Sequence, residues 1–246
     1  MELTYSDYLH LDELLAQQQQ RQPDDKDELL FIVVHQAYEL WFKQLLHEFE
    51  RVRDSLMAGD LYLSIALLKR CRTIMKLLVQ QADIVETLTP LSFSGFRDRL
   101  EHASGFQSSQ FRELEFLLGN KRPEMLRFHP TGTPAYERMS RRLDEPTVAD
   151  AFARFVALKD DRPQEGEAFQ DVLVRLYKSR PDLVLLFELL ADYDEGMQEW
   201  RYRHVKLAER TIGGKAGTGG SLGVEFLKTS LFKPLFPDLW AIRDRL

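Results

Sequence analysis

The feature that most constrains the fold is a pair of long segments in which apolar side chains recur at alternating steps of three and four residues. One segment covers residues 31–52 and the other covers residues 186–211. This spacing places the side chains on one face of an α-helix, so each segment predicts a long amphipathic helix. The positions predicted to face the core are Phe31, His35, Tyr38, Phe42, Leu45, Phe49 and Val52 in the first helix and Leu186, Leu190, Tyr193, Met197, Trp200, His204, Leu207 and Thr211 in the second.

The remaining segments also carry helical rather than extended patterns. No stretch shows the alternation of apolar and polar residues that a half-buried β-strand requires. Acidic residues at positions 24, 25 and 27 precede the first long helix, where the helix dipole favours negative charge. The expected helices cover residues 5–20, from the acidic cluster to about Gly59, 61–85 and 182–212, with a helix-turn-helix over 92–120 whose breaks are Gly95 and Gly105. The sequence therefore predicts an all-α fold.

Length and composition favour a single folded domain. The 246 residues, 44% of them hydrophobic, can form one substantial core. A net charge of −6 argues against a nucleic-acid partner, because phosphate binding requires a basic surface. The longest apolar runs, residues 29–34 and 183–187, are too short to cross a bilayer, and the first residues lack the pattern of a secretory signal. A single cysteine, Cys71, excludes an internal disulfide, so we expect a cytoplasmic protein without a membrane partner.

Two of the six histidines are placed where a cofactor could use them. No pair of histidines has the spacing of a zinc or di-iron site, but His35 and His204 each lie on the apolar face of a long helix. Either one alone is most simply a hydrogen-bonded core residue, whereas the two together favour a buried cofactor. A haem needs one axial imidazole beside an apolar chamber, and without a Cys-x-x-Cys-His motif it would bind non-covalently. Cys71 has basic neighbours and is expected on the helix surface.

A glycine-rich segment follows the last long helix. Residues 213–223 contain six of the 13 glycines, but the lysine of a phosphate-binding loop is replaced by Gly220 and no strand precedes the segment. We therefore exclude nucleotide binding. Two interpretations remain: a flexible linker that ends the helix, or a mobile lid that offers its backbone N–H groups and the Thr218 hydroxyl to a ligand.

Arg97 is the most conspicuous charged residue near the predicted breaks. It lies four residues after Phe93 and three before Leu100, so it shares a helix face with apolar side chains. An arginine in such a place either pairs with a carboxylate of the protein, such as Asp98 or Glu101, or binds a carboxylate of a ligand. The sequence alone leaves both possibilities open.

Four blocks of sequence, in the same order, resemble the tryptophan 2,3-dioxygenase family. Each is long and unusual in composition, so the resemblance is specific. The blocks are LTYSDYL at 3–9, FIVVHQAYELWFK at 31–43, FRDRLEHASGFQS at 96–108, and WRYRH at 200–204 followed by IGGKAGTGGS at 212–221.

This resemblance implies a haem b enzyme that inserts O2 across the indole C2–C3 bond of L-tryptophan to give N-formyl-L-kynurenine. It makes His204 the axial ligand of the haem iron and His35 the catalytic residue that faces the indole N–H. The other implied substrate-binding residues are Phe31, Ile32, Val33 and Val34 along the pocket, Phe93 and Arg97 at the carboxylate, Leu100, and Thr218 at the ammonium and carboxylate. Ser104 is implied to lie near the haem. Because Phe93 has no hydroxyl, it cannot hydrogen-bond the carboxylate.

The resemblance also implies a homotetramer with exchanged amino-terminal segments. Residues 1–22 would form an arm that carries Tyr5, Tyr8 and Leu9 into a neighbouring subunit's site, and residues 23–246 would form the catalytic domain. Since free indole N–H is too weak an acid to lose its proton fully to an imidazole, we assign His35 to hydrogen bonding and orientation.

Two other classes of protein compete with this interpretation. A non-catalytic haem-based sensor of gas or tryptophan would keep His204, but a gas sensor would not need Arg97 and Thr218 to bind a zwitterion. A cofactor-free helical interaction protein would explain the amphipathic helices but not the histidines on their apolar faces. The visible spectrum of the purified protein, with and without L-tryptophan, distinguishes the three.

Overall fold

The computed structural model describes residues 2–161, 168–215, 217 and 223–246. Within these residues every regular element is an α-helix or a short 3-10 helix, which confirms the predicted all-α fold. None of the described helices combines the length and apolar character needed to span a membrane. The α-helices are α1 Tyr5–Leu9, α2 Leu11–Leu15, α3 Glu28–Met57, α4 Leu61–Val85, α5 Pro90–Arg97, α6 Ser109–Leu118, α7 Pro134–Asp144, α8 Val148–Lys159, α9 Phe169–Ser179, α10 Pro181–Ile212, α11 Val224–Lys228 and α12 Pro237–Ala241.

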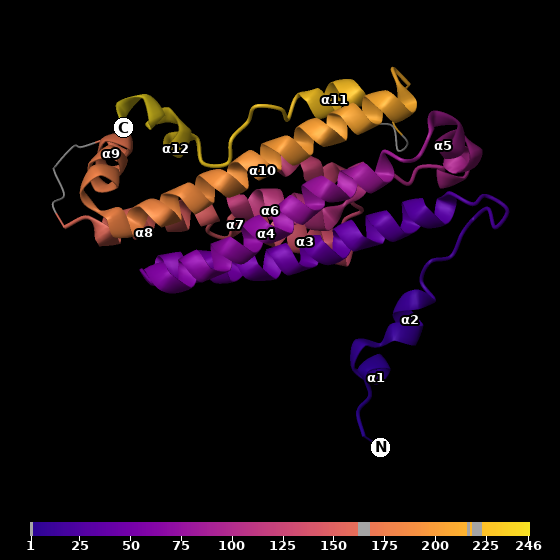
Figure 1. Cartoon of the computed structure of the whole chain (residues 1–246), viewed down its shortest axis with the longest axis horizontal. Coiled ribbons are helices and arrows are strands. Elements are labelled where there is room, and N and C mark those ends of the chain that lie inside the picture. The colour runs from indigo at the N-terminus through magenta and orange to yellow at the C-terminus, as the bar shows by residue number, and fades with distance from the viewer. Residues whose placement is uncertain (1, 162–167, 216, 218–222) are drawn as a thin grey trace.

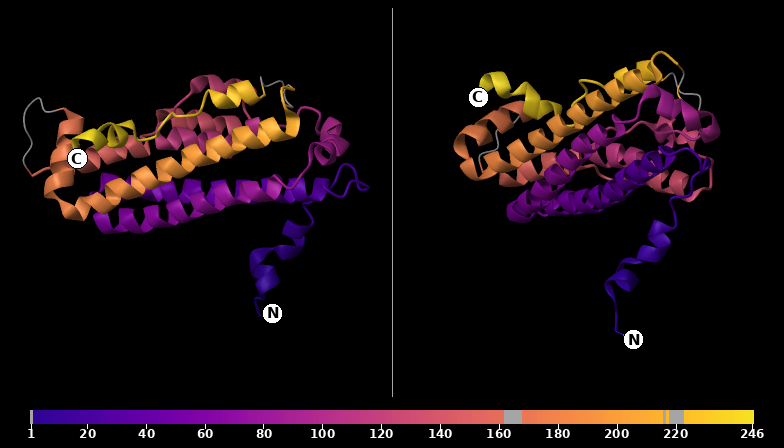
Figure 2. Two further views of the ribbon diagram at one scale, coloured as in Figure 1. Left: turned by 45° about the horizontal axis from the view of Figure 1, so that its top comes forward. Right: turned by 45° about the vertical axis from the view of Figure 1, so that its right-hand side comes forward.

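Three long helices, α3, α4 and α10, form the centre of the molecule (Figure 1). Helix α4 packs against both α3 and α10. Helices α6 and α8 pack on α3, and α7 packs on α6. At one end of α10 lie α9 and α12, and along its other end lies α11 (Figures 1 and 2). The three long helices predicted from the apolar spacing are therefore confirmed, and they determine where the remaining helices can pack.

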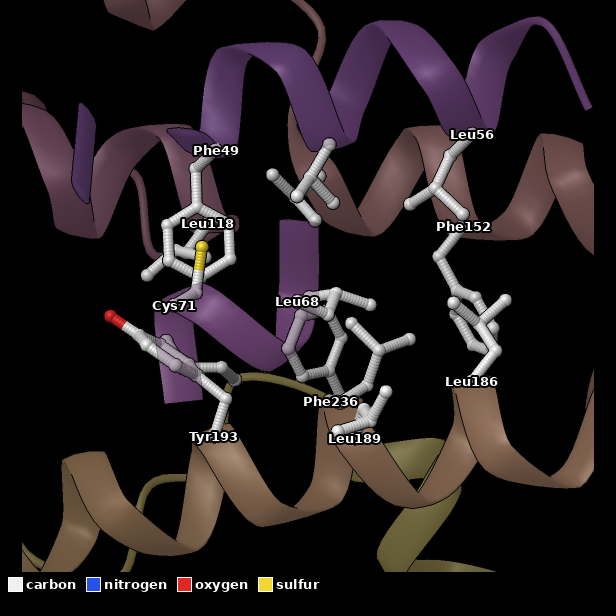
Figure 3. Packing of buried hydrophobic residues seen from close by; sticks show 14 of the residues in the cluster. Phe49, Leu56, Leu68, Cys71, Leu118, Phe152, Leu186, Leu189, Tyr193 and Phe236 are labelled. Carbon is white, nitrogen blue, oxygen red and sulfur yellow. The ribbon is translucent and has the colours of Figure 1, made fainter. Parts of the chain in front are cut away.

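The core fills the space between the long helices and α8 (Figure 3). Phe49 of α3 meets Tyr193 of α10 edge to face, with ring centroids 4.6 Å apart. Cys71 is fully buried, so the surface position expected for it is wrong. It follows Leu68 by three residues and precedes Met75 by four, which puts it on the inner face of α4 while the two basic residues before it are exposed.

A short helix, α5, leads from α4 towards α6. The hydroxyl of Thr89 accepts the N–H of Ser92 at 3.0 Å and caps this helix, and proline occupies its first turn. Gly95 lies inside α5, so the break predicted there is wrong. A single glycine weakens a helix by only about 1 kcal/mol. Two 3-10 helices, η1 (Asp98–Leu100) and η2 (Gly105–Gln107), make the actual turn before α6.

The amino-terminal segment projects away from the helical body (Figures 1 and 2). The single helix expected over residues 5–20 is instead two short helices, because His10 between them has a left-handed backbone with φ of 51°. Neither α1 nor α2 buries a residue against the rest of the chain. The segment is nevertheless fixed at its base, where the carboxylate of Glu28 accepts the N–H groups of Arg21 and Gln22 at 2.9 and 2.7 Å.

Candidate active site

A cavity of about 270 Å³ lies between α3, α4, α5, α6, α10 and α11. Its lining joins residues that are far apart in the sequence. Of the residues predicted to bind substrate or cofactor, those that line it are His35, Phe93, Arg97, Ser104 and His204. The structure thus brings both histidines of the long helices to one enclosed space.

His35 of α3 lines the cavity, and its imidazole is neutral. Its Nδ1 lies 2.7 Å from the carbonyl oxygen of Phe31. A carbonyl can only accept, so Nδ1 must carry the proton and Nε2 must keep a free lone pair. Burial lowers the pKa of His35 from its usual value near 6.5, despite the opposing effects of this hydrogen bond and of the Glu39 carboxylate. His35 therefore offers a hydrogen-bond acceptor at neutral pH.

His204 reaches the cavity from α10 and lies against Trp200. The two rings stack with centroids 5.3 Å apart and an angle of 22° between their planes. Burial, helped by the nearby His35 and Arg112, lowers the pKa of His204 to about 4. Within the described part of the chain its ring nitrogens have no hydrogen-bond partner. A neutral imidazole with a free nitrogen in an enclosed space is suited to bind a metal ion as a single ligand.

Aromatic rings form an apolar wall around His204. Trp200 packs against Phe111, with ring centroids 5.0 Å apart, and edge to face against Phe42 at 6.2 Å. Tyr38 approaches Trp200 at 6.1 Å, and its hydroxyl donates to the carbonyl oxygen of Leu78 at 3.0 Å. This wall suits a flat, apolar ligand, because aromatic rings prefer offset-stacked or edge-to-face contacts with one another.

Helix α5 contributes Phe93 and Arg97 to the cavity. It is held against α3 by three aromatic rings: Phe31 lies 5.7 Å from Phe93 and 5.3 Å from Phe96 between centroids. The ring of Phe31 also contacts His35, with centroids 4.0 Å apart. These ring contacts with α3, together with the packing of α5 on α10, therefore determine where a hydrogen-bond acceptor and a guanidinium group stand relative to each other.

A buried cluster of charges at the cavity wall could not be found from the sequence alone. The carboxylate of Glu115 in α6 receives Arg112 at 2.6 Å, Arg122 at 2.8 Å and Arg201 of α10 at 3.1 Å. Burial alone would raise the pKa of Glu115, but the three guanidinium groups outweigh burial and hold it below its usual value. All four residues line the cavity.

This cluster carries more positive than negative charge. Three guanidinium groups face one carboxylate, and within the described residues the Nε atoms of all three arginines are buried without a hydrogen-bond partner. Excess buried charge is unfavourable unless it is compensated. The cluster is therefore suited to receive an anionic group of a ligand. The signal in the sequence is that Arg112 and Glu115 lie among apolar residues of one short helix, Phe111, Leu114 and Phe116.

Other residues singled out from the sequence do not line the cavity in the described structure. Val33 is 45% exposed, and Val34 belongs to a separate small cluster with Val85 and Leu88. Phe31 stands behind His35, and neither Ile32 nor Leu100 borders the space. Roles for these residues in substrate binding remain predictions.

The two remaining groups of predicted site residues lie outside the cavity or outside the described residues. Tyr5, Tyr8 and Leu9 are exposed on the projecting segment. Thr218 is not among the described residues, so its predicted contact with a ligand remains a prediction. Gly217 and Gly223, on either side of it in sequence, border the cavity.

The fold and the cavity together define a helical protein with an enclosed site for a flat ligand and for anionic groups. The family model for tryptophan 2,3-dioxygenase matches residues 1–150 and 156–246. The chain is 49% identical to the tryptophan 2,3-dioxygenase of Anaeromyxobacter dehalogenans, with 99% of this chain and 96% of that protein aligned. It is 49% identical to the one from Herpetosiphon aurantiacus, over 99% of this chain and 98% of that protein. The chain belongs to the tryptophan 2,3-dioxygenase family.

Proposed function

We propose that this protein inserts O2 across the indole C2–C3 bond of L-tryptophan to form N-formyl-L-kynurenine, the first step of tryptophan catabolism by the kynurenine pathway. The observation that carries the proposal is that a member of this family brings His35, Arg97 and His204 to one enclosed cavity. An acceptor, a cation and a free imidazole are the groups that indole N–H, a substrate carboxylate and a metal cofactor require.

Haem b, held non-covalently, fits the residues that surround the cavity. Within the described residues, no group of three or more histidine, cysteine or acidic side chains is placed to hold a bare metal ion. Iron bound at His204 would therefore need ligands from a cofactor. His204 would bind the haem iron and the aromatic wall would contact the macrocycle, while Arg112, Arg122 and Arg201 would pair with its propionates. Ser104, which also borders the cavity, would lie beside it. When bound, haem supplies the iron that activates O2.

The residues of this chain would bind and orient the substrate. Arg97 would pair with the carboxylate of L-tryptophan, and Thr218 would contact its carboxylate and ammonium groups. The Nε2 lone pair of His35 would accept the indole N–H and hold the ring in one orientation. Phe93 would pack against the substrate without contributing a hydroxyl.

We further propose that the active protein is a cytoplasmic homotetramer with exchanged amino-terminal arms. Residues 1–22 form the arm in this proposal, and residues 23–246 form the catalytic domain. Tyr5 and Tyr8 are 75% and 69% exposed and lie with other exposed apolar side chains on one short segment, which supports a partner that covers them. Leu9 lies beside them, and all three would reach a neighbouring subunit's site. L-tryptophan and O2 are the proposed small-molecule partners, and neither nucleic acid nor membrane is involved.

The visible spectrum of the purified protein tests this proposal. A Soret band that shifts on addition of L-tryptophan, together with the appearance of N-formyl-L-kynurenine in the presence of O2 and a reductant, is the expected result. A Soret band indifferent to tryptophan would indicate a haem-based gas sensor, and a band that shifts without formation of N-formyl-L-kynurenine would indicate a tryptophan sensor. Haem-free protein that cannot be loaded with haem would contradict the proposed cofactor.

A further inference from the structure

One carboxylate lies between the start of α3 and the middle of α5. The Oδ1 atom of Asp25 accepts the N–H groups of Asp27 at 2.9 Å and of Glu28 at 3.2 Å, where α3 begins. Its other oxygen, Oδ2, lies so close to Gly95 of α5 that a β-carbon at that position would collide with it. Asp25 therefore touches both helices that bring residues to the cavity from this side.

The carboxylate of Asp25 cannot easily move out of the way. Its side chain is short, and a displacement of Oδ2 would also break the two hydrogen bonds of Oδ1 at the start of α3. The backbone of the same residue is held as well, because its carbonyl oxygen accepts the side-chain amide of Gln20 at 2.8 Å. Although Gly95 is exposed, its contact with Asp25 is thus a fixed stop between the two helices.

The two helices held apart in this way carry the two ends of the proposed substrate site. His35 lies two turns into α3, and Arg97 lies at the end of α5, two residues after Gly95. The aromatic contacts of Phe31 with Phe93 and Phe96 pull α3 and α5 together. The Asp25 carboxylate acts against this attraction, because its contact with Gly95 limits how closely α5 can approach α3.

We propose that Asp25 is a positioning residue which, fitted against Gly95, sets the separation between His35 and Arg97 and thereby selects ligands that carry both an indole ring and a carboxylate. The inference rests on the proposed function, because it assigns the two ends of L-tryptophan to these two side chains. Asp25 itself touches no substrate in this arrangement.

Three variants and a matched control test the inference by isothermal titration calorimetry. Gly95→Ala pushes the helices apart, and Asp25→Ser removes the stop while leaving a hydroxyl that can still cap α3. Each is expected to weaken binding of L-tryptophan and of indole-3-propionate, Gly95→Ala by about tenfold, because sub-ångström misplacement of a binding group has effects of this order. In the double variant Gly95→Ala/Asp25→Ser the new methyl group occupies the vacated space, and affinity should return close to that of the parent protein.

Tryptamine, a ligand without a carboxylate, distinguishes a changed separation of the two helices from a general loosening of the fold. Tryptamine affinity should stay unchanged in all three variants, since it does not bridge the two helices. Ser94→Ala, an exposed substitution in the same helix, is the control and should leave all affinities unchanged. Alanine normally stabilises a helix relative to glycine, so a lower affinity of Gly95→Ala with an unchanged or higher melting temperature would support a specific clash.

Two outcomes would overturn the inference. If the double variant binds L-tryptophan more weakly than either single variant, the two side chains act independently and no stop exists. If tryptamine loses affinity as steeply as indole-3-propionate, the substitutions disturb the whole pocket. A parent protein that binds no L-tryptophan would instead contradict the proposed function itself. The assignment of the indole ring to His35 and of the carboxylate to Arg97 would then also be lost.

Discussion

The Nδ1–H group of His35 donates a hydrogen bond to the carbonyl oxygen of Phe31, one helical turn earlier, at 2.7 Å. This contact uses the only proton of the neutral ring and leaves Nε2 as an acceptor. If His35 becomes protonated, Nε2 turns into a donor and can no longer accept the indole N–H. The tautomer therefore makes substrate orientation depend on pH.

We expect kcat/KM for L-tryptophan to fall on the acid side as His35 gains a proton. Burial lowers the pKa of His35 below 6.5, so the fall should lie below pH 6.5 and the profile should be independent of this group above it. His35→Gln keeps an amide oxygen as acceptor but does not titrate, so the acid limb due to this residue should disappear. The measurement is the pH profile of kcat/KM for both proteins.

His35→Ala should retain the fold and bound haem and lose only part of the activity. Loss of one neutral hydrogen bond corresponds to about 1 kcal/mol, or about fivefold in kcat/KM. Complete loss of turnover in both His35→Ala and His35→Gln, with unchanged tryptophan binding, would instead show that proton transfer by the imidazole is essential.

The long helices could be predicted from the sequence because each buries one continuous face against its neighbours. The same periodicity identified His35 and His204, and both line one cavity. The position of Cys71 was predicted wrongly because its basic neighbours were given more weight than its phase with Leu68 and Met75. Residue spacing along a helix, rather than the character of adjacent residues, decides which side faces the core.

The charged part of the site could not be predicted in the same way. Glu115 and Arg201 are separated by 86 positions in the sequence and meet only because α6 and α10 pack at one wall of the cavity. The contact between Asp25 and Gly95 likewise depends on how a turn before α3 meets α5. Periodicity describes one helix at a time, so contacts between side chains of different helices require the three-dimensional arrangement.

His204→Ala should lose most of its bound haem while remaining helical. The residue provides the free imidazole of the cavity, and the three long helices do not depend on it for their packing. Soret absorbance measures the haem, and far-ultraviolet circular dichroism measures the helices. His35→Ala is the matched control, since it removes an imidazole from the same cavity and should keep haem. Full haem content with an unchanged spectrum in His204→Ala would point to another ligand, with His129 the first to test.

The stability of the haem-free protein should depend on pH through His204. Its pKa of about 4 in the folded protein lies below the value near 6.5 expected on unfolding, so the unfolded chain binds the proton more readily. Stability is therefore fully present above pH 6.5 and is lost as pH falls towards 4, by at most about 3 kcal/mol. Urea unfolding of haem-free His204→Ala should show a smaller loss over this range, whereas His47→Ala, at an exposed position, should behave like the parent.

Deletion of residues 1–20 should weaken subunit association and tryptophan affinity together. Helices α1 and α2 bury no residue, and the rest of the deleted segment contacts the helical body only through side-chain hydrogen bonds such as Gln18 with Gln36, so the deletion should leave that body folded. Sedimentation and KM for L-tryptophan measure the two effects, and a triple substitution of Tyr5, Tyr8 and Leu9 by serine should reproduce the loss of affinity. A truncated monomer with a normal KM would contradict the proposed sharing of sites.

The pairing of Arg97 with the substrate carboxylate distinguishes this site from a general haem pocket. Removal of one partner from a desolvated, hydrogen-bonded charge pair typically costs about 3–5 kcal/mol. Arg97→Ala should therefore lower kcat/KM for L-tryptophan by about two to nearly four orders of magnitude. Arg97→Lys should recover little, because a single ammonium on a flexible chain cannot reproduce the two parallel hydrogen bonds of a guanidinium group.

Tryptamine separates carboxylate binding from any other role of Arg97. It lacks the carboxylate, so it should be a poor substrate of the parent protein and scarcely poorer for Arg97→Ala. If the rate with tryptamine falls as steeply as the rate with tryptophan, Arg97 holds the fold or the cofactor instead. Asp98 and a haem propionate would then be the partners to test, and the carboxylate of the substrate would have to be bound elsewhere in the cavity, with the arginines around Glu115 as the nearest candidates.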